Sequence, residues 1–247
     1  MQRSRSEREE SGPDPRRIRA VQRRLRRQQG PLTAKPDLPA IDQLIATVLS
    51  QHTSDHNSSR AFTALRARFP SWEGVLDAPS ESVADAIRAG GLAELKAVRI
   101  QRILSIIRQR EGAVRLDRLA ELNDDEVEEY LLSLPGVGPK TAACVLTFSM
   151  GRSAFPVDTH VHRVVRRLGW VPEGASAEDA YSLLRRRVPS DIRYDLHVAL
   201  IVHGRTVCRP AAPRCPDCVV QDLCAYGTAL LGRARSGGSV REGPGDG

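Results

Sequence analysis

The stretch of sequence that decides the fold is Leu134-Pro-Gly-Val-Gly-Pro-Lys140-Thr-Ala142. Glycine permits a positive φ and lets a ligand approach the backbone closely, and proline suits the first position of a helix. We therefore predict a helix ending at Leu134, a Gly-Val-Gly turn and a second helix, together a helix–hairpin–helix at about residues 123–150. The free amides that begin the second helix can hold a DNA phosphate without reading a base. A plain turn between two helices is the alternative.

Apolar residues recur at helical spacing on both sides of this hairpin. The clearest stripes before it are Ile41, Leu44, Ile45, Val48 and Leu49, and then Ile100, Ile103, Leu104 and Ile107. Further candidate helices cover residues 142–150, 161–168, 177–187 and 192–207. No stretch of the sequence sustains the two-residue alternation of a strand, and no solenoid repeat is present. These patterns predict an all-α fold.

Four of the five cysteines follow one another closely, in the order Cys208-x6-Cys215-x2-Cys218-x5-Cys224. In a reducing compartment, clustered thiols usually bind metal rather than form disulfides. Four thiolates in one short loop can enclose an iron–sulfur cube or a tetrahedral zinc ion. The spacing differs from that of paired zinc knuckles. Cys144 lies in an apolar run and is predicted to be a small core residue.

Lysine is rare in this chain, so Lys35, Lys96 and Lys140 each call for an explanation. Lys140 lies in the first turn of the predicted second hairpin helix, where the helix dipole disfavours a cation. A neutral amine can attack carbon and form a Schiff base, whereas an ammonium cannot. A phosphate contact explains a lysine here equally well, and composition favours neither interpretation. Asp158 is a good N-cap for a helix over Thr159–Leu168.

Positive charge is concentrated at the N-terminal end of the sequence. The net charge is +7, and residues 1–30 contain ten arginines against four acidic residues. We predict a disordered tail here that adds salt-sensitive affinity for nucleic acid, although an inert solvated terminus is equally possible. No apolar run approaches the roughly 20 residues of a membrane helix, and the N-terminal end lacks the apolar core of a secretory signal.

Taken together, the motifs resemble the endonuclease III family of DNA glycosylases. The hairpin is followed by Val157-Asp158-Thr159-His160-Val161, and the cysteine spacing matches that of the family's cluster in full. Leu49-Ser-Gln-His-Thr-Ser-Asp55, Gly91-Leu92 with Lys96-Ala97, and His203-Gly-Arg205 also fit. The likeness covers about residues 33–226.

The resemblance implies two helical domains with DNA bound in a cleft between them. Residues 33–152 would form a helical barrel that contains the hairpin. Residues 153–226 would form an iron–sulfur cluster domain, joined by the segment that precedes the barrel. Residues 1–32 would be a largely disordered basic tail with a connection to the cluster domain, and residues 227–247 a disordered C-terminal tail.

The resemblance also implies roles for individual residues. The family's nucleophilic lysine falls on Lys140 and its aspartate on Asp158. The pocket would be lined by Ser50, Asp55 and His160, and the DNA-binding residues would be Gln51, His52, Leu92, Gly136, Val137, Gly138 and Thr141. A 4Fe–4S cluster with a structural and redox role would be held by Cys208, Cys215, Cys218 and Cys224.

The chain departs from the family's pattern in the loops expected to enter the DNA. His52 stands where the best-known members have the glutamine that fills the gap left by the flipped base, with Gln51 one residue earlier. Leu92 fits the wedge that opens the duplex, but Ala93 and Glu94 replace the aromatic and amide residues common after it. Either Gln51 or His52 can therefore be the residue that fills the gap.

The function implied is base excision repair by a bifunctional DNA glycosylase and abasic-site lyase. It would remove damaged, most simply oxidised, pyrimidines from duplex DNA through a lysine Schiff base and β-elimination. The alternatives are a mismatch-specific glycosylase, an enzyme that is mainly an abasic-site lyase, and a non-enzymatic helix–hairpin–helix DNA-binding module. We expect a monomer whose partner is double-stranded DNA with a damaged base or abasic site, and no membrane. The expected location is the cytoplasm, associated with the nucleoid in a prokaryote.

Overall fold

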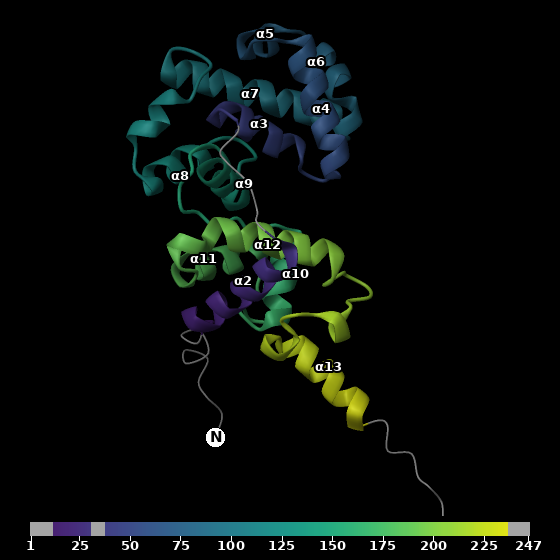
Figure 1. Ribbon diagram of the computed structural model, residues 1–247. Coiled ribbons are helices and arrows are strands. Elements are labelled where there is room, and N and C mark those ends of the chain that lie inside the picture. Colours follow the sequence, from purple (N-terminus) through teal and green to yellow (C-terminus); the bar gives the residue numbers. More distant parts are fainter. Residues whose placement is uncertain (1–11, 31–37, 237–247) are drawn as a thin grey trace, which may run out of the picture. The chain divides into compact units, whose positions relative to one another are not determined.

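The protein is helical throughout the part of the chain that the computed structural model describes, residues 12–30 and 38–236 (Figure 1). The all-α prediction is confirmed for these residues. No helix within them is long and apolar enough to cross a membrane. The chain divides into a terminal unit, Met1–Thr33 with Val157–Gly247, and a central unit, Ala34–Pro156. The sequence predicted boundaries after residues 32 and 152, whereas the structure divides the chain after Thr33 and Pro156.

The central unit contains the hairpin and the longest helix of the described chain. Its elements are α3 (Ala40–Leu49), α4 (Asp55–Arg68), α5 (Trp72–Asp77), α6 (Ser80–Ile87), η1 (Arg88–Gly90), α7 (Ala93–Glu111), η2 (Asp117–Glu121), α8 (Asp124–Leu132), α9 (Pro139–Cys144) and the π-helical turn η3 (Val145–Ser149). Asn123 begins α8 with a capping box. Its side-chain oxygen accepts from the Glu126 amide at 3.0 Å, and Glu126 Oε2 accepts from the Asn123 amide at 2.8 Å. Both terminal amides are thereby satisfied.

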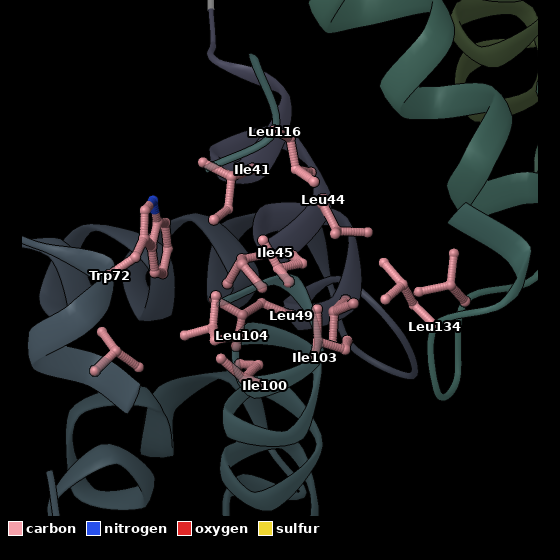
Figure 2. Close-up of a cluster of buried hydrophobic side chains, with 14 of the residues drawn as sticks. Ile41, Leu44, Ile45, Leu49, Trp72, Ile100, Ile103, Leu104, Leu116 and Leu134 are labelled. Carbon is pink, nitrogen blue, oxygen red and sulfur yellow. The ribbon is translucent and has the colours of Figure 1, made fainter. Parts of the chain in front are cut away.

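The core of the central unit draws on most of its helices, and one part of it lies between α3 and α7. Ile45 and Leu49 on α3 lie against Ile103 and Leu104 on α7, and all four side chains are fully buried (Figure 2). Burying an aliphatic side chain of this size stabilises a protein by about 1.5–3 kcal/mol. The contact therefore fixes the C-terminal end of α3 against α7. This contact also holds in place the helix ends to which two loops are joined, the loop after α3 and the loop before α7.

The terminal unit combines one helix from the N-terminal end of the described chain with the helices that follow the central unit. Its elements are α2 (Pro15–Gln29), α10 (Thr159–Leu168), α11 (Ala177–Arg187), η4 (Ser190–Ile192), α12 (Arg193–Thr206), η5 (Cys215–Asp217), η6 (Gln221–Leu223) and α13 (Ala225–Ser236). Helix α12 packs against both α10 and α2. The cysteine loop runs from the end of α12 to the start of α13.

The N-terminal segment differs from the prediction of a disordered tail. Residues Pro15–Gln29 form α2, capped by Asp14, whose carboxylate accepts from the Arg16 amide at 2.8 Å. Ile18, Val21 and Leu25 are fully buried. These apolar residues lie at helical spacing on one face and pack against α12. Their burial stabilises a helix here despite the many arginines of the segment. The prediction of disorder is wrong for residues 12–30, whereas residues 1–11 lie outside the described residues.

The C-terminal prediction also needs correction. Helix α13 runs from Ala225 to Ser236, although residues 227–247 were expected to be disordered. Its first turn is anchored to the cysteine loop, because the Thr228 hydroxyl donates to the Cys224 carbonyl at 2.8 Å. Only residues 237–247 of the expected tail lie outside the described residues.

Candidate functional site

The turn between α8 and α9 contains two glycines, and only the first of them, Gly136, has a positive φ. Gly136 has φ +74°, which favours glycine, whereas Gly138 has φ −102° and serves as the N-cap of α9. The Gly138 carbonyl accepts from the amides of Thr141 and Ala142 at 2.9 and 3.0 Å. The side chains of Val137 and Thr141 are buried. Those two residues can therefore contact a ligand through their backbone rather than their side chains.

Lys140 occupies the second position of α9, after Pro139, and its side chain is half-buried. The helix therefore begins where the sequence predicts it, with a lysine in its first turn. A cation at this end of a helix is disfavoured by the dipole by about 0.3–1 kcal/mol. Lys140 belongs to the central unit, and Asp158 to the terminal unit.

Gln51 joins the loop after α3 to the hairpin. Its side-chain amide donates to the Gly136 carbonyl at 3.1 Å, and its Oε1 accepts from Arg99 Nη1 at 3.0 Å. A Cβ atom on Gly136 would lie only 2.7 Å from Arg99 Cδ. The positive φ of Gly136 favours glycine, and a larger residue there would also displace the Arg99 side chain packed on it. The Gln51 side chain is already committed to this contact.

His52 and Leu92 are the two residues other than glycine that have a positive φ in the described chain, at 55° and 52°. Both side chains are exposed, and Leu92 is 51% exposed. A residue other than glycine is uncommon in this region of φ, and strained residues of this kind cluster at functional sites. The backbone thus singles out the two residues that were expected to enter DNA.

Lys96 makes contacts that the sequence did not reveal, although the scarcity of lysine drew attention to it. Its side chain is 2% exposed, and its ammonium donates to the carbonyls of Leu49 and Gly90 at 2.8 and 2.9 Å. Burial, and secondly the nearby Arg99 guanidinium, lower the pKa of Lys96. Its amine is enclosed and bonded, and therefore cannot reach a substrate.

The predicted pocket residues of the central unit lie around the start of α4. The Ser50 hydroxyl donates to the Thr47 carbonyl at 2.8 Å, so it is turned back onto α3. Asp55 is the first residue of α4, follows the N-cap Ser54 and is exposed. Within the central unit, the structure therefore brings the Ser50–His52 loop together with the hairpin, while Asp55 begins the next helix.

Asp158 is the N-cap of α10, as predicted. Its Oδ1 accepts from the Val161 amide at 2.7 Å. Two residues later, His160 Nδ1 lies 3.1 Å from Arg163 Nη2. Arg163 also donates to the carbonyls of Gly204 at 2.8 Å and Cys208 at 3.0 Å. The predicted pocket residue His160 is thus connected through one guanidinium to the loop that carries the first cysteine.

The four clustered cysteines, Cys208, Cys215, Cys218 and Cys224, line one cavity together with His203. All four are free thiols, and no three His, Cys, Asp or Glu side chains within residues 12–30 and 38–236 converge as the ligands of a single metal ion do. Burial raises the pKa of Cys218 to about 11 and raises the pKa values of Cys215 and Cys224 as well. These thiolates therefore need the charge of a bound metal in order to form at neutral pH.

His203 is the buried polar neighbour of this cavity. Its Nε2 atom lies 3.6 Å from Cys218 Sγ, and its Nδ1 atom is buried without a hydrogen-bond partner among the described residues. Burial lowers the pKa of His203 to about 4, so the ring is neutral at pH 7. A neutral imidazole can donate one hydrogen bond to a sulfur atom of whatever the thiols hold.

Comparison with known proteins gives a consistent result. The profile of the HhH-GPD superfamily of base excision DNA repair proteins matches residues 45–190. A putative DNA glycosylase of Arabidopsis thaliana is 44% identical over 165 residues, which are 67% of this chain and 56% of that protein. Endonuclease III of Thermotoga maritima is 35% identical over 198 residues, which are 80% of this chain and 86% of that enzyme. A solved covalent intermediate of endonuclease III trapped on DNA has a TM-score of 0.75 and 27% identity, covering 89% of this chain and 99% of that one.

The helical fold, the hairpin and the matched profile together define a base excision DNA repair protein of the HhH-GPD superfamily. Within this superfamily, the chain is 35% identical to an endonuclease III over 80% of its length. The chain belongs to the endonuclease III family and is a base excision repair DNA glycosylase. The resemblance inferred from the motifs is confirmed.

Proposed function

We propose that this glycosylase is bifunctional and that Lys140 is the nucleophile of its abasic-site lyase reaction. The observation that carries the proposal is the difference between the two lysines in the described residues. Lys96 is buried and bonded to two carbonyls, whereas Lys140 is half-buried in the first turn of α9. An amine that attacks a sugar must be accessible, and of these two lysines only Lys140 meets that requirement.

The proposed reaction begins with extrusion of the damaged pyrimidine from the duplex, because its sugar is unreachable within the stack. Positive charge develops on the sugar as the base departs, and the Asp158 carboxylate stabilises it. The Lys140 amine forms a bond to C1′ and loses a proton, while the bond from C1′ to the base breaks and the base leaves with the electron pair and takes up a proton. Ring opening gives an imine. Loss of a C2′ proton then expels the 3′ phosphate by β-elimination and cleaves the strand.

We further propose that His52, rather than Gln51, fills the gap left by the extruded base. Gln51 is bonded to both the hairpin and Arg99, whereas His52 is exposed and held at positive φ. Leu92, with the same backbone conformation, is the wedge. Ser50, Asp55 and His160 are the proposed pocket residues. The hairpin backbone from Gly136 to Gly138 holds a phosphate.

We propose a 4Fe–4S cluster as the ligand of the cysteine cavity. Four thiols that line one cavity without converging on one point suit a polynuclear cluster better than one zinc ion, which needs four ligands at about 2.3 Å. The buried Nδ1 of His203, which has no hydrogen-bond partner among the described residues, fits a sulfur-rich group that can accept a hydrogen bond. When bound, such a cluster would stabilise the cysteine loop and supply a redox centre.

The test is borohydride trapping of the imine on duplexes that carry an oxidised pyrimidine, a mismatch or an abasic site. Wild-type protein should be trapped on the oxidised pyrimidine and on the abasic site. Lys140→Gln should lose trapping and strand cleavage but still bind DNA. Lys140→Arg is the matched variant, because it keeps a charge for a phosphate contact but cannot form an imine.

Each outcome has one interpretation. Strand cleavage by Lys140→Arg would make Lys140 a phosphate contact and contradict the proposal, as would trapping of Lys140→Gln. Base release only at a mismatch would identify a mismatch-specific enzyme, and cleavage only at the abasic site would identify a lyase. Binding without any trapping by wild type would identify a DNA-binding module.

A further inference from the structure

The two strained residues of the central unit lie in separate loops that a single side chain connects. His52 follows α3 and Leu92 precedes α7, and both have a positive φ. Strain of this kind persists only when the surrounding structure holds the backbone in place. Each loop therefore needs contacts that hold its backbone, and one group supplies such contacts to both loops.

Lys96 is that group. Its ammonium donates to the carbonyl of Leu49, the last residue of α3, and to the carbonyl of Gly90, the last residue of η1. His52 lies three residues beyond the first of these carbonyls, and Leu92 two residues beyond the second. A cation at the C-terminal end of a helix is also favoured by the helix dipole. One buried charge thus fixes the starting points of both loops.

The charge itself indicates that this arrangement is more than packing. Lys96 is 2% exposed, and both bonded acceptors are backbone carbonyls rather than carboxylates. Burying an ammonium is unfavourable, and an apolar residue of similar volume often stabilises such a position equally well. What an apolar residue cannot do is bond two carbonyls from different loops at the same time.

A second set of contacts extends the connection to the hairpin. Arg99 lies one turn after Lys96 on α7 and donates to Gln51 Oε1 at 3.0 Å. Gln51 donates in turn to the Gly136 carbonyl at 3.1 Å. Lys96, Arg99 and Gln51, which we call the loop clamp, therefore bond the loop of His52, the loop of Leu92 and the hairpin turn to one another.

We propose that Lys96 is a positioning residue that sets the spacing between His52 and Leu92, so that both side chains enter one opened base pair together. This inference rests on the proposed function, in which Leu92 separates the stack and His52 occupies the gap. Lys96 does not touch the reacting atoms. Its contribution is therefore needed for a target base that is paired and has to be extruded, and is dispensable for a target that has no partner.

The experiment compares Lys96→Met with wild type on two duplexes in single turnover. Both contain 5-hydroxyuracil; in one it is opposite guanine, and in the other it is opposite a tetrahydrofuran abasic analogue, which leaves the lesion unpaired. Lys96→Met should slow cleavage of the paired lesion about tenfold or more, since small misplacements of positioning groups have effects of this order. The rate on the unpaired lesion should change much less. Lys96→Arg, which keeps a charged donor, should restore part of the difference.

Gln101→Met is the matched control. Gln101 lies on the same helix and donates to the carbonyls of Val75 and Ala78 at 3.0 and 2.8 Å, so its replacement also breaks bonds between segments of the central unit. Those segments do not carry His52 or Leu92. Gln101→Met should therefore leave the ratio of the two rates unchanged, even if its melting temperature falls.

Equal slowing of both duplexes by Lys96→Met, as for a general loss of stability, would overturn the inference. If Lys96→Met does not fold, as judged by circular dichroism, Arg99→Met tests the inference in its place. It breaks the bond to Gln51 and should also slow cleavage of the paired lesion selectively. Equal slowing by Arg99→Met would then overturn the inference. Failure of wild type to cleave either duplex would instead contradict the proposed function.

Discussion

Asp158 has a structural role that the structure shows and a chemical role that we propose. As the N-cap of α10 it accepts the Val161 amide through one carboxylate oxygen. Capping needs only an oxygen acceptor, whereas stabilising a positive sugar needs the charge. The two roles can therefore be separated by substitutions that keep or remove the acceptor.

Asp158→Asn should retain the cap and leave the free energy of unfolding nearly unchanged, while base release in single turnover slows strongly. Asp158→Ala should slow base release as well and also lower the free energy of unfolding by about 0.5–2 kcal/mol, because the cap is lost. Denaturant unfolding and single-turnover base release on an oxidised pyrimidine measure the two effects. Unchanged base release in Asp158→Asn would leave Asp158 with the capping role alone.

At the level of single residues, the sequence predicted what depends on near neighbours. The N-cap at Asp158, the positive φ of Gly136 and the position of Lys140 in the first turn of α9 follow from local spacing. The φ of Gly138 did not follow, because two glycines in one turn allow several combinations of φ. The bonds of Lys96 could not be predicted either, since its acceptor Leu49 lies 47 residues away in the sequence.

Among the helices, α2 shows how composition can mislead. Its arginines suggested a disordered tail, but Ile18, Val21 and Leu25 lie on one face and are fully buried. Arg19 forms a bidentate ion pair with Asp191, with N–O distances of 2.7 and 2.8 Å. Part of the basic charge is thus neutralised within the terminal unit, which makes α2 a structural helix as well as a charged one.

Leu25→Ala should therefore lower the free energy of unfolding by about 2–5 kcal/mol, as truncation of a fully buried leucine does. Arg19→Met is the matched variant on the same helix and should leave the unfolding midpoint nearly unchanged, because exposed ion pairs contribute little. Chemical denaturation followed by circular dichroism compares them. A Leu25→Ala protein as stable as wild type would mean that α2 is detached in solution.

For the molecule as a whole, the cysteine cavity is the feature with the largest expected effect on stability. The energy of ligation is partly energy of folding, since a preformed site does not exist in the unfolded chain. The cavity is lined by residues from α10 and α12, which precede the cysteine loop, from the loop itself, and from α13, which follows it. Metal binding should therefore hold together elements on both sides of that loop.

Purified protein should be brown and contain about four iron and four acid-labile sulfide atoms per chain if all thiolates ligate one cube. Cys218→Ser should lower the iron content and the melting temperature. Cys144→Ala, in the central unit, is the control and should keep the full iron content. A colourless wild-type protein with one zinc ion per chain would contradict the cluster.

The parts of the candidate site that could be predicted are those formed by short continuous motifs. The hairpin and the cysteine loop are each continuous in sequence, so their spacing was sufficient to propose them as candidates. Contacts that join distant segments were not predictable, among them the Arg163 bridge between His160 and Cys208, which spans 45 residues from Arg163 to the cysteine. Such contacts depend on how helices pack, which a single sequence does not specify.

The terminal unit is built from both sides of the central unit, and this has a consequence for how the chain folds during synthesis. Gln29 at the end of α2 donates to the Ala199 carbonyl of α12, 170 residues further along the chain. The whole of Ala34–Pro156 leaves the ribosome before α12 exists, and domains generally fold as units during translation. The central unit can therefore fold first, and the apolar face of α2 remains uncovered until α12 has been synthesised. In this order the terminal unit, which carries the four clustered cysteines, completes its folding after the central unit.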